Sequence, residues 1–218
     1  MHEEFIRRVR ANPECEPIET MRAFTNRILS VWGAAEREER AVKLVAVVDE
    51  LVGLYDETIQ AADPWVDLLG PVYTELASPA QISGAGQFFT PPDLADAMVA
   101  LQVPTRPEPR DGETLIRVYD PTVGCGGLLL AFARHVATHW PERLPDLHLE
   151  GGDIVHLAAE IAAIQLVANC NVHGLPVGQV LIRAEGVLGG RSCGRVILKA
   201  TGPAVATEDA GRERALPA

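Results

Sequence analysis

The residues best suited to chemistry lie in a glycine-rich segment, Asp120-Pro121-Thr122-Val123-Gly124-Cys125-Gly126-Gly127, between a predicted strand and a predicted helix. Glycines at such a junction let the backbone turn tightly and approach a ligand, which then faces the N–H groups of the helix. A dinucleotide fingerprint requires a third small residue three places after Gly126, where this chain has Leu129. The segment therefore predicts a binding loop that is not an NAD site, and Asp120 favours a positively charged or amine-bearing ligand.

A second acidic segment, Gly152-Asp153-Ile154, follows the next predicted strand. The Asp153 carboxylate can accept hydrogen bonds from both hydroxyls of a ribose, and Ile154 can lie against an adenine face. Taken alone, each of the two segments also fits an ordinary glycine turn or a helix N-cap. Their order on successive strands favours a nucleoside-type cofactor.

A third segment, Gly86-Gln87-Phe88-Phe89-Thr90-Pro91-Pro92-Asp93, has the features of a helix start. We expect Thr90 to be the N-cap, Pro91 the first helical residue and Asp93 the capping-box acid. These roles leave the two adjacent phenylalanines before the cap without a structural explanation.

In this order, the three segments resemble those of amino-methylating DNA adenine-N6 methyltransferases, most closely the modification subunit of type I restriction systems. The stretch Asp67-Leu68-Leu69-Gly70-Pro71-Val72-Tyr73 resembles the approach to that domain, and the likeness spans roughly residues 64–175. The resemblance implies S-adenosylmethionine as cofactor and DNA as substrate, with a partner subunit that supplies sequence recognition. It also implies cofactor-binding residues: Phe89, Thr90 and Pro91 at the methionine end, Asp120, Gly124, Cys125 and Gly126 near the amino acid moiety, Asp153 at the ribose and Ile154 at the adenine.

The catalytic motif of this family is missing where we expect it. Adenine N6 is a poor nucleophile, and the family uses Asn/Asp/Ser-Pro-Pro-aromatic, whose oxygens accept the amino hydrogens while the aromatic ring stacks on the flipped base. The motif should follow the fourth strand of the domain, for which residues 195–198 are the candidate. The next residues, Lys199-Ala200-Thr201-Gly202-Pro203-Ala204, contain no Asn, no double proline and no aromatic residue. The catalytic residues are therefore unknown.

Three further candidates carry weaker signals. Asp63-Pro64-Trp65 resembles the acidic variant of the catalytic motif, but it lacks the second proline and lies too close to Gly86. Glu185 stands where the family often has an acid that contacts the cofactor adenine, and a plain turn explains it equally well. His135 and His139 have metal-compatible spacing, but no acid completes a ligand pattern, so we expect no metal site.

The elements that must position these segments alternate between strand and helix after Ser83. The predicted strands are 115–119, 147–149, 179–183 and 195–198, and the predicted helices are 128–140 and 156–172. This alternation indicates a mostly parallel sheet with helices on both faces. We therefore predict an α/β class, with a partial Rossmann-like S-adenosylmethionine-dependent methyltransferase fold.

The preceding part of the chain is predicted to be helical, because apolar residues recur at helical spacing over 18–32 and over 41–59. A shorter helix is expected to begin at Asp63-Pro64, with Asp63 as N-cap, and to break or restart at Gly70-Pro71. The predicted organisation is a helical N-terminal region at 1–82, the methyltransferase domain at 83–200 and a flexible tail at 201–218.

Composition restricts the partners. The chain has 218 residues, 47% of them hydrophobic, and 19 Lys and Arg against 30 Asp and Glu give a formal charge of −11. So acidic a chain is not expected to bind DNA through bulk electrostatics. The N-terminus lacks signal-peptide features, the most apolar stretch is too short for a membrane, and the four cysteines form no CxxC pair. We expect a cytoplasmic protein without a membrane partner.

Two functions remain. The first is an S-adenosylmethionine-binding adenine-N6 DNA methylase subunit of a restriction-modification system that reaches DNA through a partner. The second is a catalytically inactive relative that acts as a binding, regulatory or assembly module. Under either, residues 1–82 are expected to contact a protein partner or a second copy. An interaction protein without a ligand is disfavoured, because the three ordered segments would then be coincidental.

Overall fold

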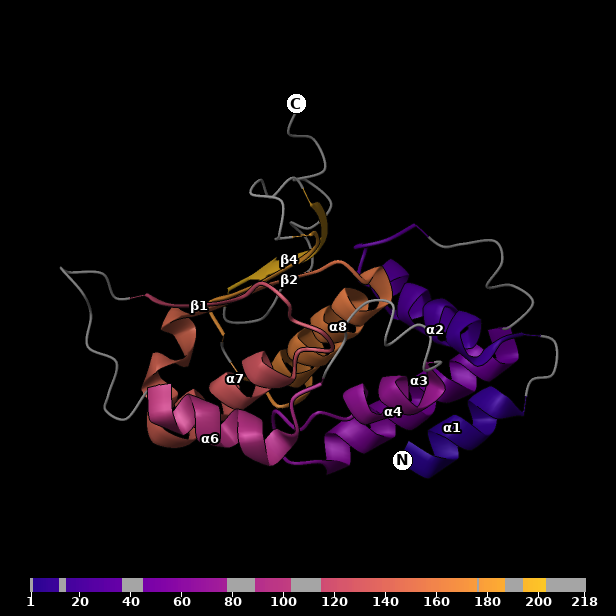
Figure 1. Ribbon diagram of the computed structural model, residues 1–218, viewed down its shortest axis with the longest axis horizontal. Helices are drawn as coiled ribbons and strands as arrows, with labels where there is room; N and C mark the ends of the chain where they lie inside the picture. Colours follow the sequence, from indigo (N-terminus) through magenta and orange to yellow (C-terminus); the bar gives the residue numbers. More distant parts are fainter. Residues whose placement is uncertain are drawn as a thin grey trace.

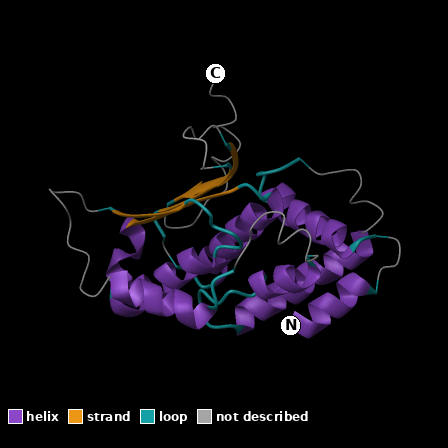
Figure 2. Ribbon diagram, in the orientation of Figure 1, coloured by secondary structure: helices purple, strands orange, loops and turns teal. Residues whose placement is uncertain are grey.

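The computed structural model describes residues 2–11, 15–36, 45–77, 89–102, 115–175, 177–186 and 194–202. In these residues a sheet forms one layer and helices pack beneath it (Figures 1 and 2). The helices are α1 (His2–Arg10), α2 (Pro17–Val31), α3 (Val45–Ala61), α4 (Gly70–Leu76), α6 (Pro92–Gln102), α7 (Gly127–His139) and α8 (His156–Val172), with a 3₁₀ helix at Pro141–Asp146. The strands are β1 (Ile116–Asp120), β2 (Leu147–Asp153), β3 (Gln179–Ala184) and β4 (Arg195–Thr201).

The sheet has the order β1-β2-β3-β4. The first three strands are parallel, whereas β4 runs antiparallel to β3. The prediction of a mostly parallel sheet is therefore confirmed. Because β1, β2 and β3 run in the same direction, their carboxyl ends meet at one edge, where ligands of open α/β sheets commonly bind.

Helices cover one face of this sheet in the part of the chain that the structure describes. In β2, Leu147, Leu149 and Gly151 are buried, whereas His148 and Glu150 between them are half-buried. Figure 1 shows α7 and α8 below the strands. The expectation of helices on both faces is wrong for the described residues, since a sheet buried on both faces carries continuous apolar strands rather than this alternation.

Helix α8 forms the centre of the molecule. It packs against β2, β3 and β4 on one side and against α2 and α3 on another. From Leu157 to Cys170 every residue except Glu160 is buried, as expected of a helix surrounded by protein. One continuous apolar core consequently runs from Phe5 in α1 to Ala200 in β4.

Aromatic rings fill the core among the N-terminal helices. The ring of Phe24 in α2 lies edge-on to those of Phe5 and Tyr55, at centroid distances of 5.2 and 5.9 Å. Helix α2 ends at Val31, and Gly33 then takes a left-handed φ of 71°, a conformation that favours glycine just past the end of a helix. Helix α3 corresponds to the prediction for 41–59, of which residues 41–44 lie outside the described residues.

The predicted helix at Asp63-Pro64 is wrong. Trp65 has a φ of 66°, which no right-handed helix allows. Side chains of α8 take the backbone N–H groups instead: Trp65 donates to Asn169 Oδ1 at 2.5 Å, and Leu68 and Leu69 donate to Gln165 Oε1 at 2.8 and 2.9 Å. Residues 62–69 thus form a loop, and α4 begins at Gly70, as predicted for the restart. We call residues 65–69, the part of this loop that α8 holds, the 65–69 loop.

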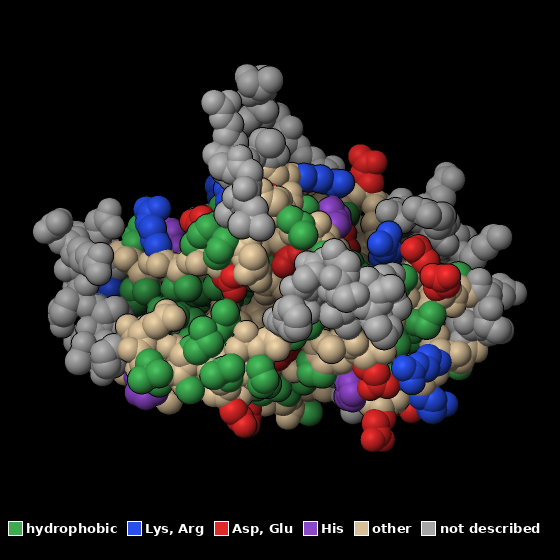
Figure 3. Space-filling view, in the orientation of Figure 1, with side chains coloured by type: hydrophobic (Ala, Val, Ile, Leu, Met, Phe, Trp, Pro, Cys, Tyr) green, Lys and Arg blue, Asp and Glu red, His purple; other side chains and the backbone are tan. Residues whose placement is uncertain are grey.

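The outer surface of the N-terminal helices is charged. Figure 3 shows acidic and basic side chains interspersed where α1 lies. Arg8 donates to Glu4 at 2.8 Å and to Glu50 at 2.9 Å. Exposed pairs of this kind contribute little to stability. No helix in the described part of the chain has both the length and the apolar character needed to cross a membrane.

Candidate functional site

Acidic side chains meet at the carboxyl edge of the parallel strands. Asp120 ends β1, Asp153 ends β2, and Glu185 directly follows β3. In the sheet register Asp120 lies opposite Gly151, and Asp153 lies opposite Ala184. The acids that the sequence placed on successive strands therefore lie at one edge of one sheet.

The glycine loop between β1 and α7 needs its glycines for two physical reasons. Gly124 and Gly126 have φ values of 52° and 93°, in the left-handed region that favours glycine. In addition, a Cβ on Gly126 would lie 3.2 Å from the Cβ of Ala162, so the missing side chain lets α7 approach α8 closely. The N–H of Val123 donates to the carbonyl of Gly152 at 2.9 Å and thereby ties the loop to β2.

Asp153 holds this loop in place. Its Oδ2 accepts a hydrogen bond from Gly124 N at 2.8 Å, and its Oδ1 accepts one from Val155 N at 2.8 Å. The side chain is buried, yet each carboxylate oxygen has a further lone pair. Asp153 therefore fixes the glycine loop and keeps capacity to accept hydrogen bonds from a ligand.

Asp120 lies near Asp153, at the start of the glycine loop. Its Oδ1 accepts a hydrogen bond from Thr122 N at 3.0 Å. Burial raises the pKa of Asp120, the Thr122 hydrogen bond opposes the rise, and the nearby charge of Asp153 adds to it. A cationic or amine-bearing group would relieve this accumulation of negative charge.

The start of α6 differs from the prediction by one residue. The helix begins at Pro92, and the carbonyl of Pro91 accepts the hydrogen bond from Ala95 N at 2.9 Å. Pro91 is thus the N-cap, and the prediction of Thr90 as N-cap is wrong. The Thr90 hydroxyl makes no hydrogen bond to another described residue, so it is available to a ligand.

Phe89 lies against the glycine loop. A Cβ on Gly124 would be 3.2 Å from Cε1 of the Phe89 ring, so the glycine makes room for it. On the other side, the ring of Tyr73 in α4 meets Phe89 edge-on at a centroid distance of 5.6 Å. Phe89 therefore joins the helical N-terminal region to the loop. Gly86, Gln87 and Phe88 lie outside the described residues.

Gln165 in α8 was missed by the sequence reasoning. Its Nε2 donates to Asp67 Oδ1 at 2.8 Å and to the carbonyl of Cys125 at 2.9 Å. Since its Oε1 accepts two further bonds from the 65–69 loop, one amide joins that loop to the glycine loop. Gln165 and Asn169 lie four positions apart and are the two polar residues of the segment from Ile161 to Cys170, which is otherwise apolar, and this pattern was the available signal.

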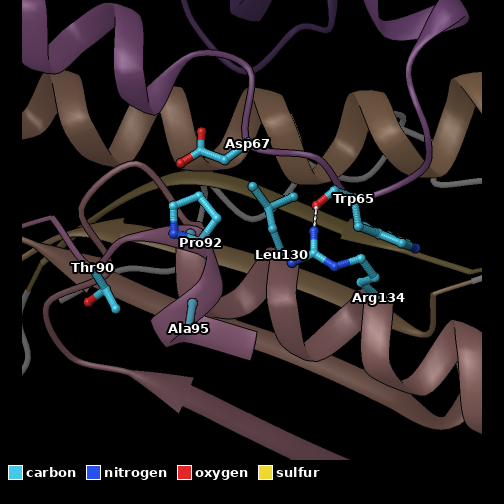
Figure 4. A pocket seen from close by; sticks show the side chains of 8 residues that line it. Trp65, Asp67, Thr90, Pro92, Ala95, Leu130 and Arg134 are labelled. Carbon is cyan, nitrogen blue, oxygen red and sulfur yellow. Dashed lines mark hydrogen bonds between the residues drawn. The ribbon is translucent and has the colours of Figure 1, made fainter. Parts of the chain in front are cut away.

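A pocket opens beside the glycine loop, at the N-terminal end of α7 (Figure 4). Its lining consists of Trp65, Asp67, Thr90, Pro92, Ala95, Gly127, Leu130 and Arg134. Figure 4 shows Arg134 bonded to the carbonyl of Trp65, at 2.8 Å, and its guanidinium also donates to Asp96. The pocket includes Thr90 but not Asp153 or Ile154, so it covers one end of the candidate site.

Glu185 and Ile154 mark the other end. Glu185 Oε1 accepts a hydrogen bond from the Tyr119 hydroxyl at 3.0 Å, whereas the buried Oε2 has no hydrogen-bond donor among the described residues. Burial, followed by the bond to Glu185, raises the pKa of Tyr119. A buried carboxylate oxygen without a donor is a position for a ligand N–H or O–H. Ile154 is 65% exposed and offers an apolar surface at the same edge.

The direction of β4 removes one predicted candidate. Because β4 is antiparallel, its carboxyl end lies at the opposite edge of the sheet, where Gly202 N donates to the carbonyl of Gly178 at 3.2 Å. The interpretation of 195–198 as the strand leading to catalytic residues is therefore wrong. The Asp63-Pro64-Trp65 candidate also fails, since the Trp65 side chain is fully buried and offers no face to a flipped base.

The remaining candidates are structural. The rings of His135 and His139 stack on each other at 4.2 Å. Among the described residues, no group of three or more His, Cys, Asp or Glu could hold a metal ion. Burial raises the pKa of the Cys125 thiol well above its usual range, so Cys125 serves the loop through its size and its carbonyl rather than as a nucleophile.

The sequence matches one family model, described as N-6 DNA Methylase, over residues 65–190. The match begins at the loop that α8 holds and includes every predicted cofactor-binding residue. No curated protein and no solved structure matches the chain.

Proposed function

The chain belongs to the N-6 DNA methylase family, whose model matches more than half of it, and we propose from this that it binds S-adenosylmethionine at the carboxyl edge of β1, β2 and β3. The family match supports a methyltransferase-like function in DNA methylation, and this family generally uses that cofactor. The observation that carries the proposal is the convergence of the glycine loop, Asp153 and the Phe89-Thr90-Pro91 segment at one edge.

The residues at this edge fit the chemistry of the cofactor. A ribose has two hydroxyl groups, and Asp153 has lone pairs to accept their hydrogen bonds. An adenine has an amino group and a flat apolar face, which suit the unpartnered Glu185 Oε2 and the exposed Ile154. The amino acid end carries both charges and suits the region of Asp120 and Thr90.

S-adenosylmethionine supplies an activated methyl group when bound. In this proposal, the residues of the chain bind and orient it: Asp153 fixes the glycine loop, and Phe89 covers that loop from the side of α4. The amino group of the target adenine needs oxygen acceptors, yet the printed sequence contains no Asn/Asp/Ser-Pro-Pro-aromatic motif. We therefore assign the acceptors to no residue of the printed sequence, and we propose that a partner subunit supplies DNA recognition, as the resemblance to type I modification subunits implies.

The same observation favours a second candidate function. A catalytically inactive relative would keep the cofactor site and act as a binding, regulatory or assembly module in the cytoplasm. Contact with a protein partner through residues 1–82 belongs to either proposal. The outer face of α1 bears ion pairs. In α6, by contrast, Leu94 and Leu101 are large exposed apolar side chains, and Figure 3 shows hydrophobic side chains over that helix.

Isothermal titration calorimetry with S-adenosylmethionine tests the cofactor proposal. Thr90→Ala should weaken binding by about tenfold, the value of one hydrogen bond to a charged group. Thr138→Ala, at an exposed position on α7, is the matched control and should bind as the wild type does. Wild-type protein that binds no S-adenosylmethionine, or a Thr90→Ala variant with unchanged affinity alongside an unaffected Asp153→Ala variant, would contradict the proposed site.

Methyl transfer separates the two functions. Labelled S-adenosylmethionine is incubated with adenine-containing DNA, with and without candidate partner subunits. Label in N6-methyladenine only when a partner is present supports the subunit function. Cofactor binding without transfer under any of these conditions supports the inactive module.

A further inference from the structure

The two carboxylate oxygens of Asp67 have different surroundings. Oδ1 accepts hydrogen bonds from Gly70 N and from Gln165 Nε2, both at 2.8 Å. Oδ2 accepts none from the described residues. It lies against Gly70, where a Cβ would clash with it, and near Gly127 at the start of α7, where a Cβ would be 3.6 Å from it. One carboxylate oxygen is therefore used by the fold, whereas the other keeps its capacity to accept, and Asp67 is among the residues that line the pocket of Figure 4.

No described cation of the protein neutralises this carboxylate. Arg134 lines the same pocket, but its guanidinium binds the carbonyl of Trp65 and the carboxylate of Asp96. Burial raises the pKa of Asp67, while the bonds from Gln165 and Gly70 oppose the rise. A largely buried carboxylate with one unmet oxygen is unfavourable unless a cationic donor pairs with it. A cationic group of a ligand could supply that donor.

The rest of the pocket favours a negative group. Helix α7 begins after Gly126, which makes no side-chain cap hydrogen bond, so the N–H groups of its first turn lack a side-chain cap and favour a negative group. Thr90 adds a hydroxyl donor that makes no bond to another described residue. The pocket thus offers acceptors for a cation and donors for an anion within one small space, which is the complement of an α-amino acid zwitterion.

We propose that Asp67 binds the α-ammonium group of the amino acid moiety of the ligand, while Thr90 and the N-terminus of α7 bind its carboxylate. This inference rests on the proposed function, in which the ligand is S-adenosylmethionine, and it adds Asp67 to the binding residues. It also explains why α8 holds the 65–69 loop so firmly. The Gln165 amide fixes Asp67 and the glycine loop together, on the two sides of the same ligand end.

The test compares three probes by calorimetry: S-adenosylhomocysteine, its analogue without the α-amino group, and 5′-methylthioadenosine, which lacks the amino acid entirely. Asp67→Asn keeps an oxygen for Gly70 and Gln165 but removes the charge. The variant should bind S-adenosylhomocysteine about 10- to 100-fold more weakly, which corresponds to the loss of a charged hydrogen bond, and its affinity for 5′-methylthioadenosine should be unchanged. Asp63→Asn, an exposed acid before the same loop, is the matched control and should change neither.

The outcomes separate this inference from the proposed function. A wild type that binds none of the probes nor S-adenosylmethionine contradicts both. An Asp67→Asn variant that binds S-adenosylhomocysteine normally overturns the ammonium assignment and leaves the cofactor proposal standing. If Asp67→Asn lost affinity for S-adenosylmethionine but not for S-adenosylhomocysteine, the Asp67 carboxylate would lie at the sulfonium, and this result would also overturn the ammonium assignment. Should the variant fail to fold, the wild type decides: equal affinity for S-adenosylhomocysteine and its deaminated analogue overturns the inference.

Discussion

Helix α8 contacts the N-terminal part of the chain in two different ways. Against α2 and α3 it packs mainly through apolar side chains, with Thr25 donating to Glu160 at 2.7 Å as a polar addition. Against the 65–69 loop it uses the amides of Gln165 and Asn169, which bond backbone groups of that loop directly. The first contact buries apolar surface, and the second fixes the position of the loop backbone.

The difference reflects what each contact has to do. Apolar packing is non-directional and stabilises a helix anywhere on a complementary surface. Hydrogen bonds between side-chain amides and backbone groups require fixed distances and angles, so they determine where a loop lies. The amide contacts occur where the loop borders the candidate site, and the apolar contacts lie away from it. Substitutions in the two regions should therefore separate stability from ligand binding.

The largest effect on stability is expected from Phe24→Ala in α2, one of the two helices that pack against α8. Phe24 is fully buried between Phe5 and Tyr55, and removal of such a ring costs about 3–5 kcal/mol. Urea denaturation measures this loss. Below the unfolding transition, the folded variant should bind S-adenosylmethionine within about twofold of the wild type. A large loss of affinity in the folded variant would show that the two regions are coupled.

Gln165→Leu probes the amide contact. Leucine keeps most of the volume, but it leaves Leu68 N, Leu69 N and the carbonyl of Cys125 without their partner. We expect a loss of about 2–4 kcal/mol in unfolding free energy, because buried backbone groups become unsatisfied. Binding of S-adenosylmethionine should fall much more than in Phe24→Ala. Gln60→Leu, exposed on α3, is the control and should leave both quantities unchanged.

Gly126→Ala tests the close approach of the glycine loop to α8. The strained backbone and the short contact to Ala162 together should lower the unfolding free energy by about 1–3 kcal/mol, as measured by urea denaturation. Gly174→Ala is the matched variant, because Gly174 also has a left-handed φ, 62°, but a Cβ there would meet nothing within 4 Å. The difference between the two variants isolates the approach of the helices. Equal losses would show that backbone conformation alone requires the glycine.

The smallest expected effect concerns pH. Burial raises the pKa of Asp67, so the folded state binds its proton more tightly than the unfolded chain does. This residue therefore makes unfolding harder as the pH falls from neutrality through its raised pKa, and at pH 7 its ionised form lowers stability. Asp67→Asn should keep or raise the melting temperature at pH 7 and lose this part of the pH dependence. A lower melting temperature at pH 7 would indicate a purely structural carboxylate.

Local patterns predicted the elements that carry the site. The strand and helices predicted at 115–119, 128–140 and 156–172 agree closely with β1, α7 and α8. Apolar periodicity and glycine stops are local signals, and they determine these elements without reference to distant residues. The three predicted segments also meet at one edge, because parallel strands bring their ends together.

The failures arose where distant residues decide the local structure. Asp63-Pro64 has the features of a helix start, but side chains more than ninety positions away bond the backbone that follows and hold Trp65 at a positive φ. The direction of β4 depends on its pairing with β3, which a short apolar run does not encode. Asp67 stands in a stretch that resembles the approach to the domain, but its hydrogen bond with Gln165 exists only in the folded chain.

Trp65 can serve as an intrinsic fluorescence probe of the candidate site. Its indole is fully buried and lines the same pocket as Asp67, and its Nε1 has no hydrogen-bond partner in the part of the chain that the structure describes. An indole in so dry a setting emits at shorter wavelength than one in water. In a variant with Trp32→Phe and Trp140→Phe, the remaining tryptophan fluorescence would come from Trp65 alone. Arrival of a charged ligand end beside it would then be visible as a change in emission, without any label attached to protein or ligand.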